Sequence, residues 1–267
     1  MPFLPFFIPK GVSVSGIIYK IYLYTWKSSI LKRKANDLLL MYIISKSRCL
    51  KKVFILNDSS SSVYLNKLWH TEKFTYLPDP YMPISLTNIH NLRCDLGISE
   101  DRQLVIHLGT LSSRKGTLTV LDMINNSNKE ELQNYCFVFA GVILDDIRDR
   151  FAEMANKLST KTQIIVIDDF LSFEKLASLV YSCDKVLLPY KRTDSSSGII
   201  GYCAQFCKPV YVPNSGLLAK LVTRFKLGLI VNTFSTIRSI EMSINVSNCY
   251  CKCHKIEDFT DIILCNK

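Results

Sequence analysis

Residues suited to holding a phosphate gather in two short segments of this chain of 267 residues. The first segment, "HLGTLSSRKG" (107–116), places Gly109 after an apolar run and Arg114 and Lys115 before the next helical pattern. A glycine lets the backbone pass close to a ligand, and adjacent guanidinium and ammonium groups suit a diphosphate. The spacing differs from that of a Walker motif, and a turn with solvated basic residues remains the alternative.

The second segment is "DSSSGIIGYCAQFCKPV" (194–210), in which three serines and a glycine precede an apolar run of helical length. The free backbone N–H groups at the start of such a helix, near Ser196, Ser197 and Gly198, can bind a phosphate. The same residues can also be no more than a polar turn that caps the helix.

Two further segments end an apolar run with residues of interest. In "FAGVI" (139–143), Gly141 ends a strand at a point where a ligand or another backbone can approach closely. In "IDDF" (167–170), Asp169 and Phe170 can face a nucleoside, or the acids can cap the following helix.

Short apolar runs alternate with amphipathic helical patterns over residues 86–235, which predicts an α/β fold with a parallel sheet covered by helices on both faces. The predicted strands are 103–109, 135–141, 163–170, 185–190 and 209–213, and the predicted helices begin near 117 and span 145–158, 173–184, 198–207 and 217–225. We expect a Rossmann-like domain over 83–267 and an incomplete, basic and helical portion over 1–82.

This alternation predicts that the segments with polar residues converge. In an open parallel sheet, ligands bind beyond the carboxyl ends of the strands, and each of these segments follows a predicted strand. A basic pair and a helix start on one sheet edge indicate a site for a nucleotide diphosphate.

The net charge of +10 is concentrated near the start of the chain, since residues 1–52 contain ten basic side chains and one acid. The basic, aromatic-containing stretch within residues 10–52 suits an anionic membrane surface or an acidic partner, and a solvated helix face is the alternative. No apolar run has the length of a membrane span, and the ten cysteines are irregularly spaced, which favours reduced thiols in the cytoplasm. We expect no nucleic-acid partner, because the basic charge lies outside the predicted sheet and no stacking motif is present.

The motifs "RKG", "FAG", "DFLSFEKLASLVYSCDKVLLPY", "SSSGIIGYCAQFCKPVYVPNSGLLAKLV" and "LGLIV" follow one another in an order that resembles the C-terminal domain of GT-B fold glycosyltransferases of family 4. The resemblance covers about residues 73–235, and "LKKVFILNDSSSSVYLNKLW" resembles the last elements of the family's N-terminal domain. It implies that Gly109, Arg114 and Lys115 contact the donor diphosphate. The same resemblance implies that the phosphates contact Ser196, Ser197 and Gly198. It also implies that the nucleoside or sugar contacts Gly141, Asp169 and Phe170.

Two family positions differ in this chain. The family usually has two glutamates eight residues apart, and the corresponding residues here are Asp194 and Tyr202. Asp194 keeps a carboxylate for the transferred sugar and is the expected catalytic residue. Tyr202 can donate a hydrogen bond, but it cannot accept a bidentate pair from a ribose diol.

The resemblance implies a glycosyltransferase that moves a sugar, with retention of configuration, from a nucleotide-diphosphate donor to a glycan or lipid-linked acceptor of polysaccharide or cell-envelope biosynthesis. We expect no metal and no cofactor besides the donor substrate, and a cytoplasmic protein that lies peripherally on the inner face of the membrane. A truncated, non-catalytic remnant that binds a nucleotide or a partner is the alternative, because most of the N-terminal domain is missing from the pattern.

Near the end of the chain, "CYCKCHKIEDFTDIILC" brings Cys249, Cys251, Cys253 and His254 together. This alternation is not the Cys-x-x-Cys spacing of structural zinc sites. We expect a strand or turn that leads into a closing helix rather than a zinc site.

Overall fold

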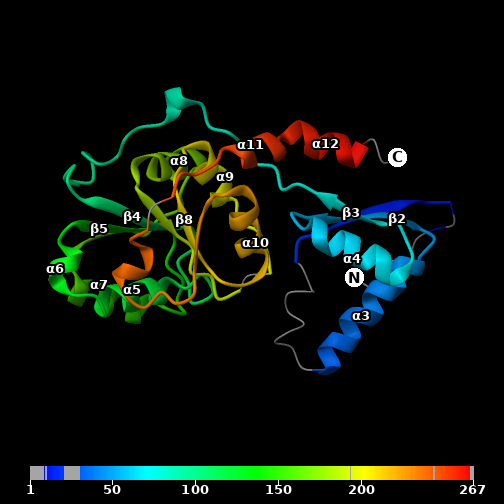
Figure 1. The fold of residues 1–267 in the computed structure, drawn as a ribbon, viewed down its shortest axis with the longest axis horizontal. Coiled ribbons are helices and arrows are strands. Elements are labelled where there is room, and N and C mark those ends of the chain that lie inside the picture. Colours follow the sequence, from blue (N-terminus) through cyan, green and yellow to red (C-terminus); the bar gives the residue numbers. More distant parts are fainter. Residues whose placement is uncertain (1–8, 10, 21–30, 193, 243, 265–267) are drawn as a thin grey trace. The chain divides into compact units, whose positions relative to one another are not determined.

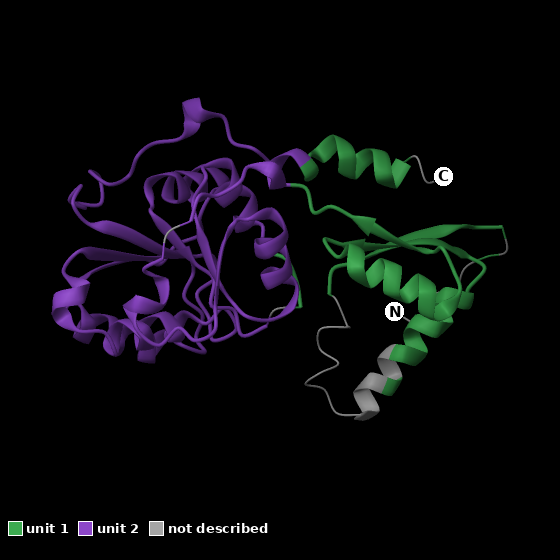
Figure 2. Ribbon diagram, in the orientation of Figure 1, with its two compact units in different colours: residues 1–80, 193–196, 253–267 green, residues 81–192, 197–252 purple. Residues whose placement is uncertain are grey.

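The computed structural model describes residues 9, 11–20, 31–192, 194–242 and 244–264, and Figure 2 shows that they form two compact units. The first unit contains residues 1–80, 193–196 and 253–267, and the second contains residues 81–192 and 197–252. The chain therefore returns twice to the first unit after leaving it. In the described part of the chain, no helix combines the length and apolar character that crossing a bilayer requires.

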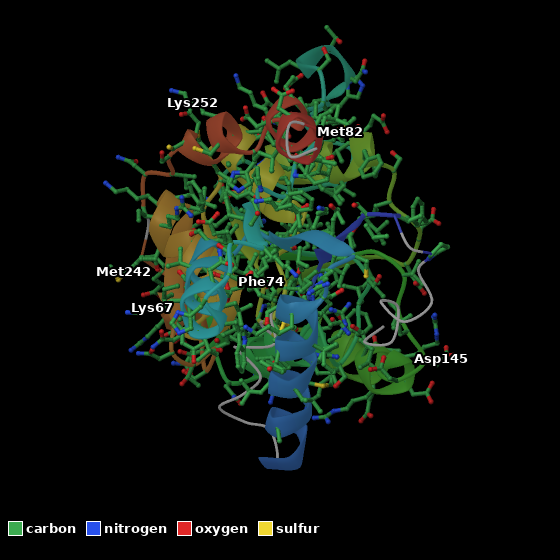
Figure 3. The ribbon with its side chains drawn as sticks, turned by 90° about the vertical axis from the view of Figure 1, so that its right-hand side faces the viewer. Lys67, Phe74, Met82, Asp145, Met242 and Lys252 are labelled. Atoms are coloured by element: carbon green, nitrogen blue, oxygen red, sulfur yellow. The ribbon has the colours of Figure 1, made fainter. Side chains whose placement is uncertain are left out.

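A three-stranded parallel sheet forms the centre of the first unit. Its strands are β1 (Val14–Ile18), β2 (Leu50–Leu56) and β3 (Phe74–Leu77), in the order β1-β2-β3. The helices of this unit are α3 (Leu31–Lys46), α4 (Ser59–Trp69) and α12 (Ile256–Leu264). Helices α3 and α4 lie on one side of the sheet and α12 on the other, as Figures 1 and 3 show.

Helix α12 completes this sheet from the far end of the chain. Three of its apolar side chains, those of Phe259, Ile262 and Ile263, pack against a buried cluster on β2 and β3 formed by Phe54, Leu56 and Leu77. On the other face, Asp58 caps the start of α4, and its carboxylate accepts hydrogen bonds from the backbone N–H groups of Ser60 and Ser61 at 3.1 and 3.2 Å. The serine run therefore starts a helix because an aspartate caps it.

The second unit is built on a six-stranded parallel sheet. Its strands are β4 (Gln103–Leu108), β5 (Tyr135–Ala140), β6 (Gln163–Ile167), β7 (Lys185–Leu187), β8 (Val210–Pro213) and β9 (Gly228–Val231). Their order in the sheet is β6-β5-β4-β7-β8-β9, so the chain winds outward in one direction from β4 and then in the other from β7. This is the doubly wound Rossmann order, and it confirms the predicted fold class.

Helices cover both faces of this sheet (Figure 1). The helices of the second unit are α5 (Thr117–Asn125), α6 (Lys129–Leu132), α7 (Arg148–Leu158), α8 (Phe173–Ser182), α9 (Ile199–Gln205) and α10 (Gly216–Phe225), with 3-10 turns η1 (Leu86–Asn88) and η2 (Ile237–Ile240). Apolar residues of α5 and α7 join the strands in one buried core, to which β5 contributes Phe137 and Phe139. Helix α8 contacts α9 and β4 on the opposite face.

The structure corrects three details of the predicted elements. Helix α7 begins at Arg148 rather than at residue 145, and α9 ends at Gln205 rather than at residue 207. The cysteine-rich segment forms a short helix, α11 (Cys249–Cys253), and not a strand. The alternation of cysteines was therefore misleading about the local conformation.

Candidate functional site

The winding direction of the second sheet changes between β4 and β7, which are neighbours in space but far apart in sequence. Because the chain winds in opposite directions from these two strands, the segments of the second unit that follow them, 109–116 and 188–192 with 197–198, diverge beyond the carboxyl ends. Ligands of doubly wound proteins bind in the crevice that such a divergence leaves. Residues of these two loops therefore define the candidate site.

Backbone contacts hold the two loops together. Gly116 adopts a φ of 72°, and a Cβ atom at this position would lie 2.0 Å from the carbonyl oxygen of Pro189. The backbone N–H of Lys191 donates to the carbonyl of Arg114 at 3.1 Å. Only a glycine allows the loop after β4 to pass so close to the loop after β7.

Gly141 has a similar structural role. Its φ is 131°, and a Cβ atom there would lie 2.2 Å from the carbonyl oxygen of Gly109. Of the two possibilities that the sequence left open, the close approach of another backbone is the one observed. Gly109 itself has a φ of 92°, and a Cβ atom added there would contact Ile199 Cδ1 at 3.8 Å.

A chain of side-chain contacts links Lys115 to the second loop. The Lys115 ammonium lies 3.9 Å from the centre of the Tyr190 ring, and the Tyr190 hydroxyl lies 3.2 Å from Ser197 Oγ. Burial, with a smaller contribution from the charge of Arg114, lowers the pKa of Lys115 to about 8. We call Lys115, Tyr190 and Ser197 the contact chain.

Arg114 adds a second positive charge beside Lys115. Its side chain is exposed, and among the described residues its guanidinium makes no hydrogen bond or ion pair. An unpaired guanidinium retains its donors for a bidentate contact to a phosphate or carboxylate.

A buried histidine on β4 stabilises the loop after that strand through hydrogen bonds. His107 on β4 is 2% exposed, and its Nδ1 lies 2.9 Å from the carbonyl of Leu187 while its Nε2 lies 3.0 Å from Thr117 Oγ1. Burial lowers the pKa of His107 to about 4, so the ring is neutral at pH 7. Because a carbonyl can only accept, Nδ1 carries the proton, and the Thr117 hydroxyl donates to Nε2.

Thr117 connects His107 to the turn that carries Arg114 and Lys115. Its Oγ1 also accepts a hydrogen bond from the backbone N–H of Ser112 at 3.0 Å, and Ser112 Oγ accepts from the N–H of Lys115 at 3.3 Å. His107, Thr117 and Ser112 thus fix the turn that carries Arg114 and Lys115.

The start of α9 follows directly after the contact chain. Ser197 is buried, whereas Gly198 is exposed and has open space around its Cα. Within the described part of the chain, the backbone N–H groups of Gly198 and Ile199 have no acceptor. These amides and the Ser197 hydroxyl are on the same loop as Tyr190.

The other predicted phosphate and sugar residues of this segment belong to the first unit. Ser196 donates its hydroxyl to Asp79 Oδ2 at 2.7 Å, and burial raises the pKa of Asp79. Asp194 is buried, with 6% of its surface exposed. Ser196 and Asp194 are therefore assigned to the first unit, and their predicted contacts with the donor stay predictions.

The predicted nucleoside and sugar contacts differ in exposure. Phe170 is 82% exposed and follows Asp169, which is exposed as well. Ser172, not an acid of this segment, caps α8 by accepting from the N–H of Lys175 at 3.2 Å, so the capping alternative is wrong. The neighbouring Asp168 instead accepts from the N–H of Ile143 at 2.8 Å.

Tyr202 lies in the interior of the second unit. It is 5% exposed, and its ring meets the ring of Tyr81 edge-on, with 6.5 Å between the ring centres. The preceding residue, Gly201, is also pressed against Tyr81, where an added Cβ atom would lie 2.5 Å from Tyr81 Cβ. Tyr202 thus packs as an aromatic core residue, and its contact with a ribose stays a prediction.

The cysteine-rich segment places its histidine in a polar contact. His254 is fully buried, and its Nε2 lies 3.0 Å from Asn57 Oδ1. Among the residues that the structure describes, no group of three or more metal-ligating side chains comes together.

Sequence reasoning missed Tyr190 and His107. Tyr190 reads as the last apolar residue of "KVLLPY", and His107 reads as one polar residue within a buried strand. The proximity of Lys115 to Tyr190 depends on the pairing of β4 with β7, and local sequence patterns carry no signal for that pairing.

Comparison with known proteins supports the resemblance inferred from the motifs. No family model matches the chain. A curated relative, the alpha-galactosylglucosyldiacylglycerol synthase of Streptococcus pneumoniae, is 27% identical over 124 residues. That match covers 44% of this chain and 32% of the relative, so it spans about a third of the relative's length.

Solved structures resemble the whole chain more broadly. Anabaena Alr3699/HepE in complex with UDP is similar with a TM-score of 0.70 and 14% identity, over 95% of this chain and 71% of that one. WaaG, a glycosyltransferase involved in lipopolysaccharide biosynthesis, has a TM-score of 0.62 and 14% identity, over 95% of this chain and 68% of that one. The fold is that of GT-B glycosyltransferases, as the motifs predicted.

Proposed function

We propose that this chain acts as a glycosyltransferase and that the crevice beyond the carboxyl ends of β4 and β7 binds the diphosphate of its nucleotide-sugar donor. The observation that carries the proposal is the contact chain, in which a partly buried lysine and a serine hydroxyl both contact Tyr190 at the point where the sheet changes its winding direction. The UDP and UDP-glucose complexes of the structurally similar HepE support a nucleotide-sugar as the ligand class.

The proposed chemistry is the breaking of the bond between the sugar's anomeric carbon and the diphosphate, with a new bond to an acceptor hydroxyl. Negative charge develops on the leaving diphosphate, and fixed positive groups stabilise it most effectively. Arg114 and Lys115 supply that charge, and Ser196, Ser197 and the amides near Gly198 supply hydrogen bonds. We propose no metal or other cofactor for this step.

The remaining site residues are proposed from their positions in the motifs. Asp194 is proposed to contact the transferred sugar, and Asp169, Phe170 and Tyr202 are proposed to lie by the nucleoside or sugar. Gly109 and Gly141 shape the loop edge and keep its backbone close to the donor. Retention of the anomeric configuration is part of the same proposal.

The proposed acceptor is a glycan or a lipid-linked molecule of the cell envelope. The two relatives that support it are a galactosylglucosyldiacylglycerol synthase and a transferase of lipopolysaccharide biosynthesis. We propose that basic side chains within residues 10–52 hold the protein at the inner face of the membrane. Residues 10 and 21–30 of that stretch, including Lys10 and Lys27, lie outside the described residues.

Calorimetric titration with UDP and with GDP tests the donor site. We expect one of the two nucleotides to bind, and we expect the double variant R114Q/K115Q to lose at least about tenfold in affinity, because charge-assisted bonds to phosphate are lost. The matched control is K252Q, since Lys252 is an exposed lysine on α11 of the same unit (Figure 3).

Two outcomes would contradict the proposal. Failure of both nucleotides to bind the unaltered protein would remove the donor site. Binding without release of sugar from any nucleotide-sugar, in the presence of diacylglycerol glycolipids or glycans, would favour a non-catalytic nucleotide-binding protein instead.

A further inference from the structure

A second cavity lies at the opposite edge of the six-stranded sheet, where β4 and β6 begin. Its volume is about 590 Å³. The residues that line it are Gly97, Ser99, Arg102, Lys129, Gln133, Ser159, Thr160, Lys161, Thr162 and Gln163. All of them belong to the second unit, and we call this cavity the amino-edge pocket.

The lining of the amino-edge pocket is positively charged. Arg102, Lys129 and Lys161 contribute three cations, and no lining residue is acidic. Of the acids close to it in sequence, Glu131 forms an ion pair with Arg238 at 2.5 Å and Asp101 accepts a hydrogen bond from the Ser99 hydroxyl. The positive charge of the pocket is therefore not neutralised by its own lining.

These cations keep donors available for a ligand. Arg102 uses Nη1 for Gln163 Oε1 at 3.2 Å, and Lys161 Nζ donates to the carbonyl of Asn125 at 2.8 Å. Lys129 has no hydrogen bond or ion pair among the described residues. A guanidinium has five N–H donors and an ammonium has three, so each group can still donate to an anion.

The rest of the lining is polar and neutral. The hydroxyls of Ser159 and Thr160 donate to the carbonyls of Asn156 and Lys157 at 2.6 and 2.9 Å, which leaves their oxygens free to accept. The carboxamide of Gln133 adds a donor and an acceptor, whereas the carboxamide of Gln163 already accepts from Arg102 and donates to the Gly97 carbonyl at 3.0 Å. Such groups match the hydroxyls of a sugar rather than an apolar chain.

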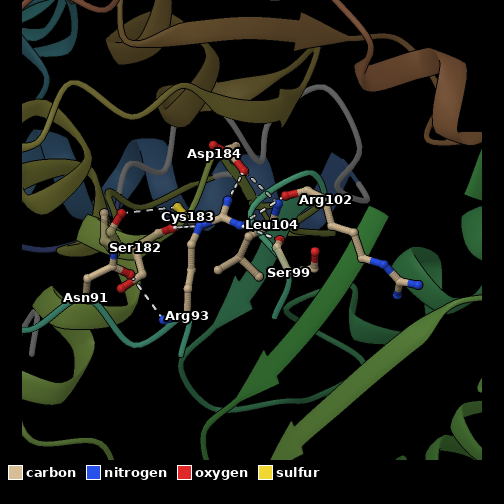
Figure 4. A network of polar contacts seen from close by, with 9 residues as sticks. Asn91, Arg93, Ser99, Arg102, Leu104, Ser182, Cys183 and Asp184 are labelled. Atoms are coloured by element: carbon tan, nitrogen blue, oxygen red, sulfur yellow. Dashed lines mark hydrogen bonds and ion pairs between the residues drawn. The ribbon is translucent and has the colours of Figure 1, made fainter. Parts of the chain in front are cut away.

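A buried arginine holds one wall of the pocket in place, as Figure 4 shows. Arg93 donates from Nη1 to the carbonyls of Ser99 and Arg102 at 3.3 and 3.0 Å, and from Nη2 to the Asp184 carboxylate at 2.5 Å. Asp184 also accepts from the N–H of Leu104 at 2.7 Å, which ties the wall to β4. The wall is therefore preorganised without a ligand.

We propose that the amino-edge pocket binds a phosphorylated saccharide, with its phosphate on Arg102, Lys129 and Lys161 and its hydroxyls on the neutral polar residues. The volume lies within the range of about 300 to 1,000 Å³ that small-molecule sites occupy. The six residues of β4 separate this pocket from the donor crevice by roughly 20 Å, at about 3.3 Å per residue. A saccharide bound in the amino-edge pocket is therefore a different molecule from the donor that reacts.

Titration with glucose 1-phosphate, glucose and inorganic phosphate tests the proposal on the full chain, with UDP present at saturation to occupy the donor crevice. We expect glucose 1-phosphate to bind, glucose not to bind, and inorganic phosphate to bind at least about threefold more weakly than glucose 1-phosphate. In K129E, the affinity for glucose 1-phosphate is expected to fall at least about tenfold, because one attraction becomes a repulsion.

The control is K252E, which makes the same charge change on an exposed lysine of α11. K161Q serves as a second variant, and circular dichroism and UDP affinity confirm that each variant is folded. Equal affinity of K129E, K161Q and the unaltered protein for glucose 1-phosphate would overturn the proposal. Equal affinity for inorganic phosphate and glucose 1-phosphate would overturn the saccharide part of it.

Discussion

The two edges of the six-stranded sheet both present basic side chains, but they position them by different means. At the carboxyl edge, glycine backbones touch neighbouring backbones, and Lys115 lies partly buried against the Tyr190 ring. At the amino edge, side chains do the positioning, and the buried Arg93 holds the carbonyls of the wall. The carboxyl edge should therefore respond most to backbone changes, and the amino edge to the loss of one side chain.

The largest effect is expected for Gly116→Ala at the carboxyl edge. The new Cβ atom would lie 2.0 Å from the carbonyl oxygen of Pro189, at a φ of 72° that disfavours any residue but glycine. We expect the free energy of unfolding, measured by denaturant titration, to fall by about 4 kcal/mol or more. A variant that does not accumulate in folded form would show the same destabilisation to a larger degree.

Gly198→Ala is the matched control for that change, since Gly198 lies in the same site with open space and an αR conformation. Its stability is expected to stay within about 0.5 kcal/mol of the unaltered protein. If Gly116→Ala cost no more than Gly198→Ala, backbone contact would not be what holds the carboxyl edge together.

A smaller loss is expected for Arg93→Met at the amino edge. The Arg93 side chain is 9% exposed, and its removal takes one donor from each of three carbonyls and the positive partner from the Asp184 carboxylate. We expect a loss of about 3 kcal/mol, measured by denaturant titration, with some of the Asp184 penalty relieved because that side chain is 43% exposed.

Arg238→Met is the comparison for this variant, because Arg238 pairs with Glu131 at 2.5 Å but is 70% exposed. Exposed ion pairs contribute about 0 to 1 kcal/mol, so little change is expected. Equal losses in the two arginine variants would show that the amino edge does not depend on the buried arginine.

The same contrast explains which features the sequence could predict. The strands of the second unit were predictable because short, nearly continuous apolar runs are typical of a parallel sheet with both faces covered, as in β5, where every residue is buried. Arg114 and Lys115 were predictable candidates because basic residues directly before a helix suit a diphosphate. The amino-edge pocket had no such motif, since its residues come from three separate segments, 97–102, 129–133 and 159–163.

Other features required the three-dimensional arrangement. A glycine after a strand permits close approach, but the sequence around Gly141 does not indicate whether a ligand or the backbone of Gly109 approaches it. The cysteine-rich segment showed a period of two, which favours a strand, yet it folds as α11 directly before α12. Helix α12 is placed by its packing on β2 and β3, about 200 residues earlier in the chain.

The smallest expected effect concerns pH and the affinity for UDP. Burial lowers the pKa of Lys115 to about 8 in the free protein, and a bound diphosphate favours the charged ammonium and raises that pKa again. Binding is therefore strongest below pH 8 and weakens above it. Calorimetry at constant ionic strength should show a loss of about tenfold between pH 7 and pH 9, equivalent to about 1.4 kcal/mol.

Lys115→Arg separates this cause from others, because a guanidinium stays charged throughout the range. In that variant the affinity for UDP is expected to stay nearly constant from pH 7 to pH 9, whatever its absolute value. An equal pH dependence in both proteins would mean that Lys115 is not the group whose charge the nucleotide requires. The affinity of the carboxyl edge for UDP would then come from Arg114 and the amides near Gly198, and the partly buried Lys115 would only pack against the Tyr190 ring.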